Sequence, residues 1–159
     1  MITSTFGKTG KQIKDSSQLA KKRIVTLEDH FSGVLWGIVT QVKEYQLSWH
    51  LNKALGFDLK RTDDLEIIHK KKNKTSAFSF YRYEHALDKW QVIVLSNKHA
   101  GEFLLPEVKQ VDYLLMVKGE ISAEQEEGIF AKVKEIHIVQ LLVKLDFQRL
   151  KSKENLMVE

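Results

Sequence analysis

The 159-residue sequence contains no cysteine, only one proline and no long uninterrupted apolar run. The lack of cysteine excludes disulfides and thiolate metal sites, and it is compatible with a reducing compartment. No apolar run approaches the roughly 18 to 20 residues that a membrane-spanning helix needs, and residues 1–20 lack the apolar core of a signal peptide. These absences predict a soluble, cytoplasmic protein that does not associate with a membrane.

The common catalytic and cofactor-binding motifs are also missing. The sequence has no dinucleotide-binding fingerprint, no nucleophile elbow and no HExxH zinc motif. Its six histidines show no paired ligand spacing on any one predicted element. We therefore expect no cofactor and no metal site, and we assign no catalytic residue.

The composition is that of a globular protein, with 43% hydrophobic and 29% charged residues. The net charge of +4 is unevenly placed, because residues 1–24 carry six basic side chains and one acidic one. Residues 25–159 hold 19 basic and 20 acidic groups, so no basic domain is left once that segment is set aside. The sequence predicts a flexible basic leader at 1–24, a single domain at 25–150 and a C-terminal tail at 151–159.

Two segments have the pattern of helices. Residues 43–55 place Leu47 and Leu51 on one apolar face, and Gly56 stands where a left-handed cap belongs. Residues 123–135 follow Ser122, which forms a capping-box pair with Gln125. On the first of these helices, Tyr45 and Trp49 lie one turn apart on a different side from the apolar face, where they indicate either packing beneath a loop or a partner surface.

Six segments have the β-branched, aromatic or alternating pattern of strands, and Leu65–Lys71 and Ala77–Tyr83 among them predict a hairpin. Gly37, inside the first strand, predicts a bulge or a close backbone approach. The last two strands and the helix between them predict a right-handed crossover if these strands are parallel neighbours. The fold class that results is α+β: a two-layer domain with a mainly antiparallel sheet of about six strands and two helices on one face. The six segments are residues 33–40, 65–71, 77–83, 89–97, 111–118 and 137–146.

Three of the predicted strands are apolar at successive positions, which implies cover on both faces of the sheet. Two helices shield only one face. Curling of the sheet, the N-terminal segment or a second subunit could cover the other. Each fully covered apolar side chain is worth roughly 1.5 to 3 kcal/mol, so a handful of such residues on the second face would favour a cover. We expect a second subunit to supply it in a homodimer, with self-closure of the sheet as the alternative.

The stretch LLPEVKQVDY, residues 104–113, holds the only proline and sets two carboxylates against apolar residues. Pro106 suits an extended connection or the first position of a helical turn, and Glu107 suits the free N–H groups of such a turn. Asp112 heads an otherwise apolar row of the next strand and, if buried, must be hydrogen-bonded or paired. We expect these acids to fasten the loop; the alternative is a ligand or catalytic site around Glu107, Asp112 and Tyr113.

This stretch resembles the signature of the bacterial family named after its motif, IPExxxVDY, with Leu105 in place of the isoleucine. The segments YQLSWHLNKALGFDL, from residue 45, and LKSKENL, from residue 150, are similar to the family's first helix and closing segment. The resemblance covers roughly residues 30–157. It implies no catalytic residues, because the family has no assigned activity, and it adds Trp49, Asn52, Pro106, Glu107, Asp112 and Tyr113 as residues to test.

Three functions fit these observations. The first is a non-enzymatic interaction or assembly module with a protein partner, whose surface would be the second sheet face or the Tyr45, Trp49 and Asn52 side of the first helix. The second is an unrecognised ligand or catalytic site at the motif. The third is RNA binding through the basic leader and the aromatic residues of the hairpin.

Overall fold

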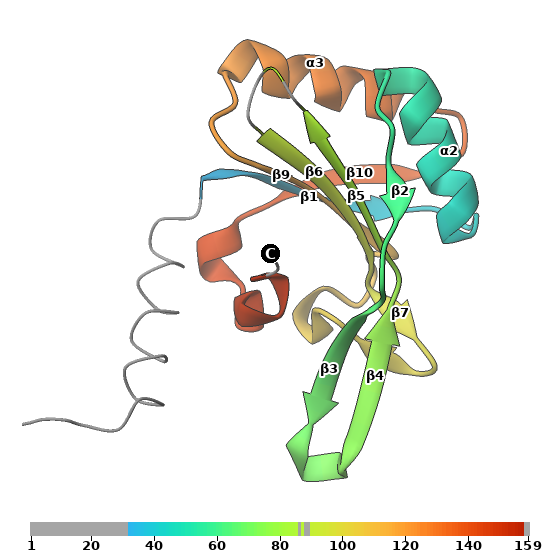
Figure 1. Cartoon of the computed structure of the whole chain (residues 1–159), viewed down its shortest axis with the longest axis vertical. Helices are drawn as coiled ribbons and strands as arrows, with labels where there is room; N and C mark the ends of the chain where they lie inside the picture. The colour runs from blue at the N-terminus through green and yellow to red at the C-terminus, as the bar shows by residue number, and fades with distance from the viewer. Residues whose placement is uncertain (1–31, 86, 88–89, 158–159) are drawn as a thin grey trace, which may run out of the picture. The chain divides into compact units, whose positions relative to one another are not determined.

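The computed structural model describes residues 32–85, 87 and 90–157, so the predicted leader at 1–24 lies outside the described residues. A six-stranded sheet forms the centre of this part of the chain (Figure 1). Every pair of neighbouring strands in it is antiparallel. In spatial order the strands are β10 (Leu141–Leu145), β1 (Gly33–Val39), β9 (Tyr113–Lys118), β6 (Trp90–Ser96), β5 (Phe80–His85) and β2 (Lys60–Arg61).

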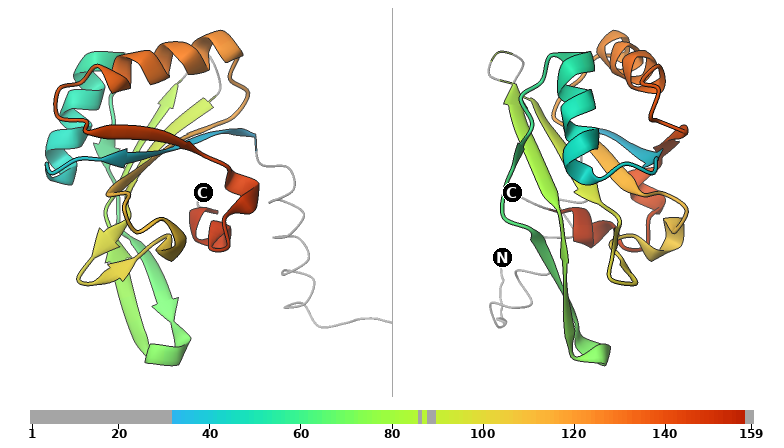
Figure 2. Two further views of the ribbon diagram at one scale, coloured as in Figure 1. Left: turned by 180° about the vertical axis from the view of Figure 1, so that it is seen from behind. Right: turned by 90° about the vertical axis from the view of Figure 1, so that its right-hand side faces the viewer.

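Two helices, α2 (Glu44–Leu55) and α3 (Ala123–Lys134), lie on the same face of the sheet (Figure 2). Gly56 ends α2 in the left-handed conformation, with φ of 70°, and the Ser122 and Gln125 capping box opens α3. Both features confirm the sequence prediction, as does the α+β class itself. Within the described residues neither helix is long and apolar enough to cross a membrane.

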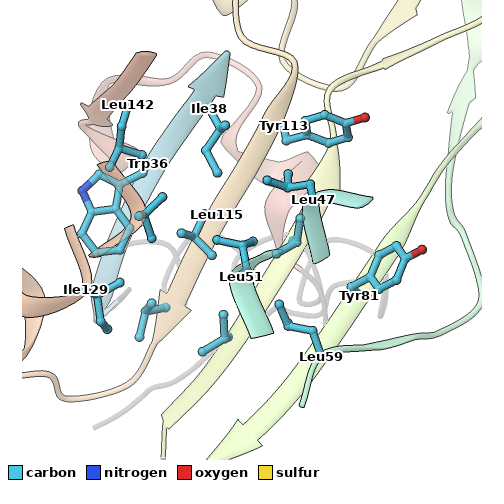
Figure 3. Packing of buried hydrophobic residues seen from close by; sticks show 14 of the residues in the cluster. Trp36, Ile38, Leu47, Leu51, Leu59, Tyr81, Tyr113, Leu115, Ile129 and Leu142 are labelled. Atoms are coloured by element: carbon cyan, nitrogen blue, oxygen red, sulfur yellow. The ribbon is translucent and has the colours of Figure 1, made fainter. Parts of the chain in front are cut away.

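The main core lies between the helices and this face. Alternate residues of the central strands, including Trp36, Leu115 and Tyr113, point towards the helices (Figure 3). Leu47 and Leu51 of α2 pack against them and are fully buried. The apolar face predicted for α2 therefore forms the contact that places the helix on the sheet.

The last strand–helix–strand unit differs from the simplest expectation. β9 and β10 both pair antiparallel with β1, which lies between them. They are thus parallel to each other without being neighbours, and α3 crosses over β1. The last strand is also shorter than predicted, because residues 137–140 precede it as a turn and a bend.

The predicted hairpin exists, but its second arm was wrong. β3 (Leu65–His69) pairs with β4 (Lys74–Phe78) through a 3₁₀ turn at Lys70–Lys72, and this pair forms a separate two-stranded sheet. Residues 80–83, assigned to the same arm, belong to β5 in the main sheet. The break falls at Ser79, whose N–H donates to the Ser96 hydroxyl oxygen at 3.0 Å. A side chain from another strand thus ends the arm.

The second face of the sheet is covered by segments of the same chain. β7 (Lys98–His99), β8 (Glu102–Phe103) and the 3₁₀ turns Pro106–Val108, Phe147–Arg149 and Lys153–Leu156 lie on the side away from the helices (Figures 1 and 2). They and their neighbours carry six buried apolar residues: Leu104, Leu105, Val111, Phe147, Leu150 and Leu156. The sheet side chains that alternate with the main core are buried as well: Leu35, Ile93, Leu95, Leu114 and Met116.

Gly37 is the place where this cover comes closest to the sheet. A Cβ added at Gly37 would lie 2.7 Å from Cγ2 of Val111, which is too close for a real contact. The sequence predicted a bulge or a close backbone approach at this glycine, and the close neighbour is instead the side chain of Val111. The contact also explains why a residue without a side chain stands in the middle of a central strand.

We expect Gly37→Ala to lower the free energy of unfolding by about 1 to 3 kcal/mol, because the new methyl group overpacks against Val111. Gly128→Ala is the matched control: Gly128 lies within α3, and an added Cβ meets nothing within 4 Å. That change should stabilise the protein by about 0.5 to 1 kcal/mol. Urea unfolding of both variants measures this, and equal effects of the two substitutions would contradict the packing described.

Candidate functional site

The connection between β6 and β9, residues 97–112, is here called the motif loop. Asn97 begins it and is completely buried. The amide nitrogen of Asn97 donates to the carbonyl oxygens of Val108 and Val111 at 3.0 and 2.9 Å, and its amide oxygen accepts the N–H of Leu105 at 2.7 Å. Both polar atoms of the buried amide are therefore satisfied, and one side chain at the start of the loop holds its second half.

Sequence reasoning missed Asn97. The only local signal was a polar residue directly after an apolar strand. The Leu105 N–H donates to the Asn97 side chain, and the Val111 carbonyl accepts a hydrogen bond from it. Both residues are fully buried, so the position of the motif residues depends on Asn97. Pro106 then stands at the first position of the 3₁₀ turn, where its missing N–H costs nothing.

Glu107 is exposed and faces the C-terminal segment. Its carboxylate accepts the backbone N–H of Ser152 at 2.7 Å. Burial alone would raise the pKa of Glu107, but hydrogen bonds from the backbone and hydroxyl of Ser152 and from nearby backbone groups outweigh it and lower the pKa below its usual value. Asn155 adds a second link, since its side-chain amide donates to the carbonyl of Leu104 at 2.9 Å. These contacts tie the motif loop to the C-terminal turns.

Asp112 faces another segment, the connection between β1 and α2. One of its carboxylate oxygens accepts the backbone N–H of Thr40 at 3.0 Å, and the other accepts a hydrogen bond from Lys98 Nζ at 2.8 Å. Thr40 is buried and donates its hydroxyl proton to the carbonyl of Ile138 at 2.6 Å. Asp112 and Thr40 together therefore link the motif loop, the end of β1 and the chain leading to β10.

Tyr113, the first residue of β9, completes this linkage. Its hydroxyl group donates to the carbonyl oxygen of Val42 at 2.8 Å, just before α2 begins. Burial raises the pKa of Tyr113 to about 12, and the nearby carboxylates of Glu44 and Asp112 act in the same direction. The phenol therefore stays protonated and acts as a donor that fixes the start of α2.

Asp112 and Tyr113 lie in the wall of a cavity of about 700 Å³ at the end of the sheet, here called the polar pocket. Glu107 and Pro106 are not among its lining residues. The two motif carboxylates therefore do not share one cavity, and each has its own hydrogen-bond donors.

A second hollow, of about 460 Å³, lies between α2 and the end of α3, and we call it the Trp49 groove. Trp49 is 56% exposed, and Lys53 Nζ lies 5.0 Å from the centre of its ring. The His50 ring stands edge-on to Trp49 at 4.9 Å and to His137 at 5.3 Å. The lining residues are Trp49, His50, Lys53, Ala54, Lys132, Glu135, Ile136 and His137.

The other two residues predicted for this surface have different surroundings. Tyr45 is exposed but does not line the groove. The Asn52 amide is used within the chain: its oxygen accepts the N–H of Leu59 at 2.8 Å and its nitrogen donates to the Leu59 carbonyl at 3.3 Å. Asn52 thus fixes the turn after α2.

The structure of the hairpin supports RNA binding less than its sequence did. Phe78 and Phe80 are buried, so they present no surface for base stacking. Lys72 and Lys74 both contact the carboxylate of Glu102, at 3.3 and 3.2 Å. The hydrogen bonds from Lys74 and Lys72 hold the pKa of Glu102 below its usual value.

Across the part of the chain that the structure describes, no three side chains of His, Cys, Asp or Glu gather as metal ligands. No family model, curated protein sequence or solved structure matches this chain. The resemblance to the IPExxxVDY family therefore stays a prediction.

We expect Tyr113→Phe to lower the free energy of unfolding by about 1 kcal/mol at neutral pH, because the Val42 carbonyl loses its donor. The folded pKa of Tyr113 lies above the usual value of 10, so its stabilising effect is complete below pH 10 and is lost as the pH rises towards 12. The stability difference between wild type and Tyr113→Phe should shrink across that range. Chemical unfolding from pH 8 to 11.5 checks this, and a constant difference would contradict it.

Proposed function

We propose that this chain is a non-enzymatic interaction module that binds a protein partner through the Trp49 groove. The exposure of Trp49 is the observation that carries the proposal. A large aromatic ring in a hollow between two helices is typical of the residues that dominate binding energy at protein interfaces. The helix that presents it is held rigidly, since α2 is packed by Leu47 and Leu51 and its start is fixed by Tyr113.

The charges around the groove favour a partner segment that is acidic and has an apolar anchor. Lys53 and Lys132 line the groove against one acidic residue, Glu135. An apolar side chain of the partner would pack on Trp49 and Ile136, while its carboxylates would face the two lysines. A helix or an extended peptide both satisfy this description.

The hydrogen bonds of the motif support a structural role for it rather than a catalytic one. Asp112 and Glu107 serve separate segments, and each accepts a backbone N–H group. An acid and base pair would need the two carboxylates to face one reacting group. We therefore assign the motif to holding α2, and with it the Trp49 groove, in place.

The homodimer predicted from the sequence loses its main support. That prediction rested on a second sheet face without cover, and segments of the same chain now account for cover there. We also propose that the module acts in the bacterial cytoplasm, which the absence of cysteine and the family resemblance support.

The test compares full-length wild type, Trp49→Ala and Leu141→Ala as baits for binding proteins from a bacterial lysate. Leu141 is a matched control, because it is also an exposed large apolar residue but lies on β10, outside the groove. A specific partner should be kept by Leu141→Ala and bound about 30-fold more weakly by Trp49→Ala, a loss of about 2 kcal/mol. Lys53→Glu should also weaken its binding.

Tryptophan fluorescence then checks the contact directly. Trp36 and Trp90, the other two tryptophans, are only 1% and 6% exposed, so acrylamide quenching in the free protein reports mainly on Trp49. The partner should protect this fluorescence from quenching. A partner that binds Trp49→Ala as tightly as wild type, or leaves quenching unchanged, would overturn the proposal.

A further inference from the structure

The polar pocket is separate from the Trp49 groove, since the two share no lining residue. It lies where the end of β1 and the starts of β9 and β5 meet the motif loop. Its volume of about 700 Å³ is within the range of small-molecule sites. Asp112 and Tyr113 hold its walls in place through the hydrogen bonds described above, so the cavity is built from fixed segments.

Most of the charged groups in the wall are paired with one another. Asp112 pairs with Lys98 at 2.8 Å, and Arg61 contacts Asp64 at 2.7 Å and Glu44 at 3.7 Å. An ionic ligand would have to compete with these pairs for its contacts, at a cost in desolvation and lost pairing. With Lys43, the lining holds three basic and three acidic residues when His99 is neutral, so it presents no net charge to attract an ion.

Some neutral polar groups of the wall are not matched in this way, although the hydroxyl groups of Thr40 and Tyr113 are. Ser79 is 8% exposed and lines the pocket, and its buried hydroxyl oxygen has no hydrogen-bond partner among the residues that the structure describes. The Ser96 hydroxyl accepts the N–H of Ser79, which leaves its own proton for another acceptor. Three exposed carboxamides, those of Gln41, Gln110 and Gln140, also line the pocket.

A buried hydroxyl group without a partner costs free energy, and native proteins rarely keep one unless a bound water or ligand satisfies it. Ser79 stands in the wall of a cavity where most charges are paired and some neutral polar groups are not, which indicates the class of that ligand. We propose that the polar pocket binds a small uncharged molecule rich in hydroxyl or carboxamide groups, with the Ser79 hydroxyl as one of its hydrogen-bond partners.

The test titrates the isotope-labelled full-length chain with neutral and charged probes and follows backbone amide shifts by NMR. The neutral probes are D-glucose and N-acetyl-D-glucosamine; the charged ones are glucose 6-phosphate and glucosamine. We expect the neutral probes, at up to tens of millimolar, to shift amides around Ser79, Ser96 and Asp112. The charged analogues should bind at least about 10-fold more weakly.

Two serine variants separate binding from folding. Ser79→Ala should weaken the neutral probes about 3- to 10-fold, the effect of one lost hydrogen bond, while leaving the melting temperature of the free protein unchanged or slightly raised. Ser48→Ala is the matched control, because the Ser48 hydroxyl is also buried and has no partner within the described part of the chain, but it lies on α2 and does not line the pocket. It should leave binding unchanged.

Four results would overturn the proposal: no shift from either neutral probe, shifts that map outside the pocket, charged analogues that bind as tightly as neutral ones, or unchanged binding in Ser79→Ala. A lower melting temperature of free Ser79→Ala would also count against it, since it would show that a bound water already satisfies the hydroxyl. None of these outcomes bears on the Trp49 groove, which Ser79 does not line.

Discussion

The amide of Asn97 is buried at the point where β6 ends, and the structure on that side of the sheet depends on its three hydrogen bonds. They connect it to Leu105, Val108 and Val111, which lie 8, 11 and 14 residues further along the chain. A loop of this length loses much conformational entropy when it is ordered. The fully satisfied amide, together with the burial of Leu105 and Val111, offsets that cost and stabilises the folded conformation of the motif loop.

The motif residues in turn hold three other parts of the chain in place. Val111 packs on Gly37 and thereby fixes the loop on the central strand. Glu107 holds the C-terminal turns through Ser152, and Asp112 with Tyr113 holds the connection that leads into α2. Both candidate functional surfaces follow from this arrangement, because one is a hollow beside α2 and the other has Asp112 in its wall. The motif residues act as positioning residues in this account.

The sequence predicted the elements whose signals are local. α2 combines an apolar face with Gly56 at its end, and α3 begins at a capping box, so neighbouring residues alone define them.

The break at Ser79 depends on Ser96, which is 17 residues away and in another strand, and no pattern near Ser79 predicts it. The cover of the second face was missed for the same reason. Its apolar residues are scattered through loops and 3₁₀ turns, where neither a helical nor a strand period reveals them. For Tyr45 and Trp49 the sequence left open whether they pack beneath a loop or form a partner surface, and the structure shows both side chains exposed. The polar pocket is assembled from segments distant in the sequence.

Native-state hydrogen exchange of the Leu105 amide tests the central role of Asn97 most directly, because this N–H donates to the Asn97 side chain. In wild type it should exchange only through global unfolding, as slowly as the amides of β6 and β9. In Asn97→Ala it should exchange at least about 30-fold faster, reflecting a local loss of about 2 kcal/mol or more, while the amides of α3 keep their protection relative to global stability. A Leu105 amide that exchanges rapidly in wild type, or one that stays equally protected in Asn97→Ala, would contradict the account.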